Sequence, residues 1–129
     1  MTLCSSLWLN AQNFIHPGML HTQADLDRTK AKVEAGEEPW ASAYRKLLTS
    51  PHVSLDWKAA PVEKIVRGGR TIWEPDPDNY QLAYRDAATA YQCALVWHIS
   101  GDKAYADKSV QILNAWAKTC LLYTSDAAD

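Results

Sequence analysis

The sequence predicts an all-α fold built from helical hairpins, and two observations indicate this. Apolar residues recur at intervals of three and four in four stretches between residues 22 and 118, which is the spacing of one helix face. Recognised helix start and stop signals separate these stretches.

A first hairpin is predicted before residue 51. Thr22 fits an N-cap, and Asp25 stands three residues later in an arrangement like a capping box. Gly36 supplies the stop of this helix. Pro39 then opens a second helix, which ends before Pro51.

A second hairpin is predicted from about residue 80 to residue 118. Its first helix has one apolar stripe, made of Tyr84, Ala87, Ala88, Tyr91, Ala94, Leu95 and His98. Gly101 ends this helix, and Asp102 caps the next one. That last helix carries two apolar stripes, and such a helix is normally buried between neighbours. We therefore expect a partner layer of helices that the four predicted helices do not supply.

Residues 51–78 form a connection far longer than the usual few residues, and they are too apolar for a disordered linker. From Trp57 to Trp73 the charged residues are Lys58, Lys64, Arg67 and Arg70 against Glu63 alone. A cationic loop flanked by tryptophans suits an acidic sugar polymer, because guanidinium groups pair with carboxylates in bidentate fashion and indoles stack on sugars. The equal alternative is that the tryptophans pin the loop to the helices while the arginines are solvated.

Both ends of the chain are expected to lie outside the natural domain. Residues 120–129 are identical to the translation of a sequencing adapter, so we expect the natural sequence to end at Thr119 and the tail to contribute nothing to the fold. Residues 1–12 resemble the end of a secretory signal, which favours a periplasmic or secreted protein; an ordinary packing segment is the alternative. The domain is then residues 13–119.

Charge and cysteine content argue against several classes of protein. The chain has 13 Lys and Arg against 15 Asp and Glu, and two of the acids, Asp126 and Asp129, lie in the tail. No basic excess suggests nucleic acid, and no stretch is long enough to cross a membrane. Cys4 and Cys93 lack metal-ligand spacing, so we expect no disulfide framework, no metal and no cofactor.

Several segments resemble the start of the alginate-lyase domain family. They are residues 14–28, 40–48, the turn Val66-Arg-Gly-Gly69, 86–95 and, most specifically, 100–116. The resemblance covers essentially residues 13–119. It implies that the hairpins form the N-terminal part of an incomplete α/α toroid. Heparinase-type lyases begin with a similar helical pattern, so the resemblance defines the reaction class more closely than the substrate.

The reaction implied by the resemblance is β-elimination on a uronate polymer such as alginate. It needs a group that neutralises the C5 carboxylate, a base for the C5 proton and an acid for the leaving oxygen. In the family these groups come mostly from an Asn/His segment and later tyrosines, which would lie downstream of Thr119; no catalytic residue is assigned here, and this fragment alone is expected to be inactive. Substrate contacts are expected from residues on or beside the cationic loop: Arg67, Arg70, Trp73 and Tyr80.

Two other functional classes stay open. A glycoside hydrolase on a similar toroid would need paired carboxylic acids at the scissile bond, for which Asp76, Asp78 and Asp86 are candidates. The second hairpin also resembles a tetratricopeptide unit, which would make the chain a protein-binding scaffold. That class predicts a repeat of about 34 residues, and the first two helices do not repeat the second pair.

Overall fold

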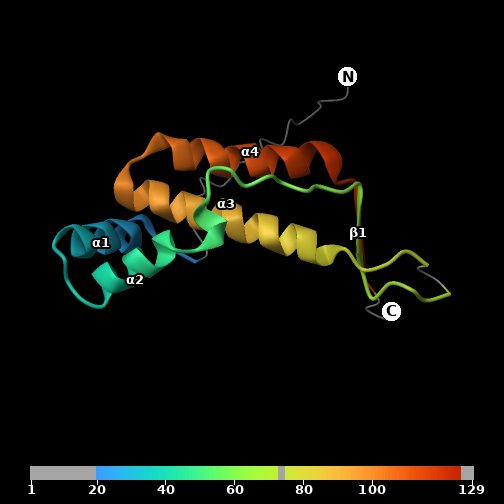
Figure 1. The fold of residues 1–129 in the computed structure, drawn as a ribbon, viewed down its shortest axis with the longest axis horizontal. Coiled ribbons are helices and arrows are strands. Elements are labelled where there is room, and N and C mark those ends of the chain that lie inside the picture. Colours follow the sequence, from blue (N-terminus) through green and yellow to red (C-terminus); the bar gives the residue numbers. More distant parts are fainter. Residues whose placement is uncertain (1–19, 73–74, 126–129) are drawn as a thin grey trace, which may run out of the picture.

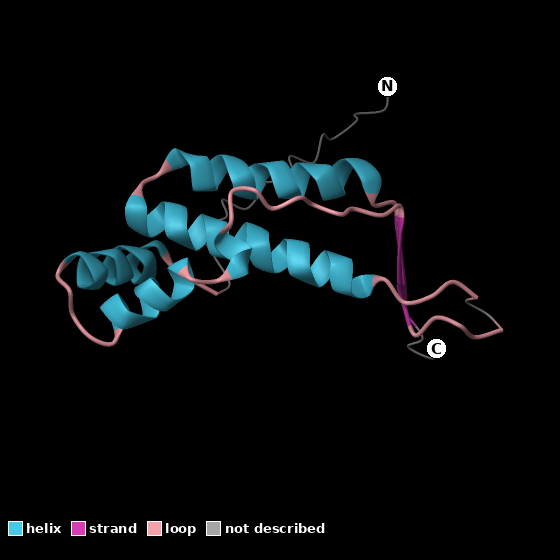
Figure 2. Cartoon of the chain, viewed as in Figure 1, coloured by secondary structure: helices cyan, strands magenta, loops and turns pink. Residues whose placement is uncertain are grey.

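The computed structural model describes residues 20–72 and 75–125. Within them the helices are α1 (Gln23–Glu34), α2 (Trp40–Leu48), α3 (Tyr80–Ser100) and α4 (Lys103–Thr119). A single 3-10 turn, η1 (Pro51–Val53), and two short strands, β1 (Lys64–Arg67) and β2 (Leu122–Ser125), complete the elements of this part of the chain. The predicted all-α class is confirmed, because helices dominate the structure (Figure 2).

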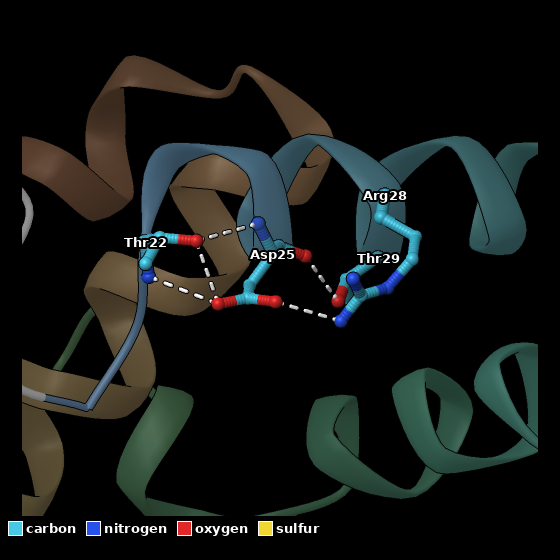
Figure 3. Close-up of polar contacts among 4 residues, drawn as sticks. All are labelled: Thr22, Asp25, Arg28 and Thr29. Carbon is cyan, nitrogen blue, oxygen red and sulfur yellow. Dashed lines mark hydrogen bonds and ion pairs between the residues drawn. The ribbon is translucent and has the colours of Figure 1, made fainter.

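The start of α1 is fixed by the predicted capping box (Figure 3). The Asp25 backbone N–H donates to the Thr22 hydroxyl oxygen at 3.2 Å, and the Thr22 backbone N–H donates to the Asp25 carboxylate at 3.1 Å. The Thr22 side chain first, then its backbone and Arg28, hold the pKa of Asp25 below its usual value. Thr22 and Asp25 thus satisfy donors that a helix start otherwise leaves open.

The two long helices α3 and α4 lie side by side and antiparallel, and α1 and α2 pack beside the C-terminal part of α3 (Figure 1). Gly101 makes the turn between α3 and α4 with a φ of 75°, and the Asp102 carboxylate caps Ala104 N at 3.0 Å. One stripe of α4 faces α3 through the buried Ile112. The other predicted apolar stripe of α4, with Val110 and Leu113, is exposed.

The connection between α2 and α3 has more regular structure than the sequence predicted. It contains η1, packs along α3 and α4, and forms β1 beside the start of α3 before the turn that leads into α3 (Figure 1). Its buried anchors are Val53, Ile65 and Val66. Because β1 has only four residues, two of which in a row are buried, it lacks the alternation that identifies a strand in a sequence.

The expectation that residues 120–129 contribute nothing to the fold is wrong for part of the tail. β2 pairs with β1 in parallel, with Lys64 opposite Leu122 and Arg67 opposite Ser125. Leu121 N also donates to Glu63 O at 2.8 Å. The physical reason is that β1 offers an open edge, and a short segment rich in apolar, aromatic and β-branched residues can pair with it. The adapter origin of the tail stays a prediction.

Candidate functional site

The end of β1 and the first turns of α3 bring one arginine and two tyrosines together, and we call Arg67, Tyr80 and Tyr84 the arginine–tyrosine cluster. The Arg67 guanidinium lies over the Tyr80 ring, 5.4 Å from its centroid, and donates to the Tyr84 hydroxyl at 3.3 Å. The two tyrosine rings meet edge to face at 5.2 Å. Arg67 and Tyr84 are exposed. The cluster is therefore a cationic and aromatic surface whose members orient one another.

Asn79 explains why these side chains meet. Its carboxamide oxygen accepts from Val66 N at 2.8 Å, its amide donates to Lys64 O at 3.0 Å, and its backbone N–H donates to Val66 O at 3.1 Å. These three bonds imitate a strand partner for β1 at the residue that precedes α3. Val66 and Asn79 are bonded to each other, and Arg67 and Tyr80 are the residues that follow them. Arg67 and Tyr80 therefore lie next to each other.

The turn after Arg67 is equally well fixed. Gly69 N donates to the Asp78 carboxylate at 2.7 Å, and Arg70 N donates to Asp76 O at 3.1 Å. Lys64 also pairs with the Asp76 carboxylate at 2.9 Å. These three interactions close the turn that follows Val66-Arg-Gly-Gly69.

The predicted substrate-binding residues have different outcomes. The structure brings Arg67 and Tyr80 together, whereas Arg70 lies on the turn with an exposed side chain and a φ of 66°. Trp73 lies outside the described residues. Tyr84 was not among the predicted substrate contacts. Its position four residues after Tyr80 nevertheless places both rings on one helix face.

Trp57 has the structural role that was the alternative for the loop tryptophans. Its indole N–H donates to Asp86 at 2.8 Å, and the indole N–H of Trp116 donates to the same carboxylate at 2.7 Å. Ala60 N adds a third bond at 2.8 Å. Asp86 is only 2% exposed, so this buried carboxylate joins the connection, α3 and α4. The Arg85 guanidinium lies over the Trp57 ring, 5.4 Å from its centroid.

The three acids considered for a hydrolase all make structural bonds. Asp86 is surrounded by three N–H donors, and Asp78 accepts from Gly69 N in the turn. Asp76 pairs with Lys64. Each of the three carboxylates therefore has a partner that helps to hold the connection in place.

The buried polar residues of α3 also hold the connection. His52 Nδ1 lies 2.9 Å from the Thr89 hydroxyl, which donates its own proton to Arg85 O at 2.9 Å. His52 Nδ1 must therefore be the donor of this pair. Burial raises the pKa of the Cys93 thiol, which keeps it protonated and unsuited to act as a nucleophile.

Two cavities of the described part are lined by residues outside the arginine–tyrosine cluster. An apolar cavity of about 210 Å³ lies between α1, α2 and α3, and burial raises the pKa of Tyr44, which lines it. A smaller space of about 80 Å³ adjoins Trp57, Arg85 and Asp86. Among residues 20–72 and 75–125, no three His, Cys, Asp or Glu side chains gather as metal ligands would. None of the helices described is long and apolar enough to cross a membrane.

Comparison of the chain with family models, with curated proteins and with solved structures gives no match. Two observations therefore bear on function: the geometry of the arginine–tyrosine cluster, and the resemblance of residues 13–119 to the start of the alginate-lyase domain family.

Proposed function

We propose that the chain is part of a polysaccharide lyase that cleaves uronate-containing polymers, alginate or similar, by β-elimination. The observation that carries the proposal is the exposed Arg67 guanidinium held between the tyrosines of the cluster. The resemblance to the alginate-lyase domain family supports the reaction class. The signal-like residues 1–12 favour a periplasmic or secreted location for the protein.

The cluster suits a uronate for chemical reasons. A guanidinium binds a carboxylate through parallel N–H bonds, which gives orientation as well as affinity. Stacking on Tyr80 and bonding to Tyr84 orient Arg67 in advance, so less side-chain freedom is lost when the ligand binds. The tyrosine rings offer flat faces for sugar rings, and their hydroxyls offer hydrogen bonds to sugar oxygens.

In this proposal Arg67 is a binding residue. Charge neutralisation at the uronate carboxylate also favours elimination, since negative charge develops there as the C5 proton leaves. Removal of that proton and protonation of the leaving oxygen are not assigned to any of the described residues. The described residues hold and orient the polymer.

The two other classes receive less support from the geometry. The hydrolase acids are used in structural bonds, as described above. A repeat scaffold would need similar hairpins, but α1 and α2 have 12 and 9 residues while α3 and α4 have 21 and 17.

Replacing Arg67 by glutamine is expected to weaken the binding of an oligomannuronate by about tenfold or more. A hydrogen bond to a charged group contributes roughly 1.5–3 kcal/mol, and each 1.4 kcal/mol is about a factor of ten in affinity. Isothermal titration calorimetry of the whole chain with a mannuronate tetrasaccharide measures this change.

Arg45→Gln is the matched control for Arg67→Gln. Arg45 is an exposed arginine of α2 that pairs with Glu38 at 2.9 Å, so its loss changes the net charge equally. We expect this variant to bind like the unsubstituted chain. Equal affinities for the two variants would show that the cluster is not the uronate site.

A further inference from the structure

The face of α3 that carries the cluster continues beyond it. Tyr84 and Tyr91 are seven positions apart, which is close to two helical turns, so both side chains point the same way. They are 53% and 42% exposed, and the exposed Ala87 lies between them. The two tyrosines are separated along the helix axis by roughly 10 Å. The small side chain of Ala87 leaves a shallow surface between them, which we call the Ala87 floor.

Tyr91 is held in a way that parallels Tyr84. The His21 Nε2 atom lies 2.5 Å from the Tyr91 hydroxyl, and the two rings are nearly parallel, with centroids 6.0 Å apart and planes 9° apart. The Tyr84 hydroxyl is held by Arg67 at 3.3 Å. The hydroxyls of Tyr84 and Tyr91 are therefore each oriented by a side-chain nitrogen from outside α3.

The same face is closed after Tyr91. His98, a further two turns along, is covered by α1, and its Nε2 lies 3.7 Å from the Asp27 carboxylate. The part of this face that is not covered by α1 thus runs from Tyr80 to Tyr91. Beyond Tyr91 the Asp27 carboxylate would repel an acidic chain.

We propose that Tyr84, Ala87 and Tyr91 form a binding track that extends the arginine–tyrosine cluster and holds the next sugars of an acidic oligosaccharide. This inference rests on the proposed function, because Arg67 supplies the charge complementarity that selects an anionic ligand. A carboxylate anchored at Arg67 directs the following sugars onto the Ala87 floor. The Tyr91 hydroxyl, oriented by His21, then meets a sugar oxygen about a disaccharide length away.

The track predicts a dependence on ligand length that the cluster alone does not. Tyr91→Ala is expected to weaken the binding of a mannuronate tetrasaccharide by about three- to tenfold, the range for a lost hydrogen bond with some lost contact. The same variant should bind the disaccharide within about twofold of the unsubstituted chain, because the disaccharide is held at Arg67. Calorimetric titration of the whole chain with both probes measures the two effects.

Trp97→Ala is the matched control. Trp97 is an aromatic residue of α3 with 44% exposure, similar to that of Tyr91, but it points away from the track. It should leave the binding of both probes unchanged. Tyr91→Phe keeps the ring and its packing, so it tests the hydroxyl even where the alanine variant folds poorly; we expect about twofold to threefold weaker tetrasaccharide binding.

The outcomes separate the track from the proposed function. If Arg67→Gln weakens binding while both Tyr91 variants bind the tetrasaccharide normally, the track is wrong and the cluster stands. Equal losses for disaccharide and tetrasaccharide in Tyr91→Phe would also overturn the track, since they indicate a structural role for Tyr91. If the unsubstituted chain binds neither probe, both the track and the proposed function are wrong.

Discussion

Replacing Asp86 by asparagine is expected to lower the free energy of unfolding by about 3 kcal/mol or more. All three neighbours of this carboxylate, the two indoles and Ala60 N, are donors. An asparagine has one oxygen and places an N–H group against another N–H group, which leaves buried donors unsatisfied. Hydrogen bonds to charged groups contribute roughly 1.5–3 kcal/mol each, so the loss is large for a domain of ordinary stability.

Urea unfolding followed by tryptophan fluorescence measures the effect, because the indoles of Trp57 and Trp116 both donate to Asp86. Asp107→Asn is the control: Asp107 lies on α4 in an exposed pair with Lys103, and such pairs contribute less than about 0.5 kcal/mol. Similar stability of the two variants would mean that Asp86 does not join the connection to the helices.

Gly69→Ala should also destabilise the protein, by roughly 2–3 kcal/mol, for a steric reason. A methyl group at Gly69 would lie 2.0 Å from Asp76 O and 2.8 Å from a methyl of Val66. Asp76 O is a backbone atom that accepts from Arg70 N, so it cannot move away without opening the turn. Because the turn follows Arg67 directly, the variant should weaken oligomannuronate binding as well.

Gly36→Ala separates this clash from ordinary backbone strain. Gly36 has a φ of 69°, but a methyl group there meets no atom within 4 Å. The left-handed conformation alone costs about 1 kcal/mol for alanine. Thermal unfolding of both variants should therefore show a clearly larger loss for Gly69→Ala, and equal losses would show that the turn is not closed as described.

The helices could be predicted because their signals are local. Thr22 with Asp25, Gly101 and Asp102 each define a helix end through residues a few positions away. The strands could not be predicted, because β1 has only four residues and pairs in parallel with β2, which lies far along the chain.

The site was predicted only in part, for the same reason. Positive charge and position in the loop indicated Arg67 and Tyr80, but the contribution of Tyr84 depends on how β1 meets α3. The structural role of Asp86 could not be predicted, because the residues that bond it lie 26 to 30 positions away. Only the folded chain shows that two indoles enclose it.

Titration of the isotope-labelled chain with a mannuronate tetrasaccharide, followed by NMR, tests the uronate site most directly. We predict that the largest shift changes fall on the Arg67 side-chain N–H groups and on the rings of Tyr80 and Tyr84, with none at Arg45. Saturating tetrasaccharide that leaves the Arg67 signals unchanged, or that shifts Arg45 equally, would contradict a uronate site at the arginine–tyrosine cluster.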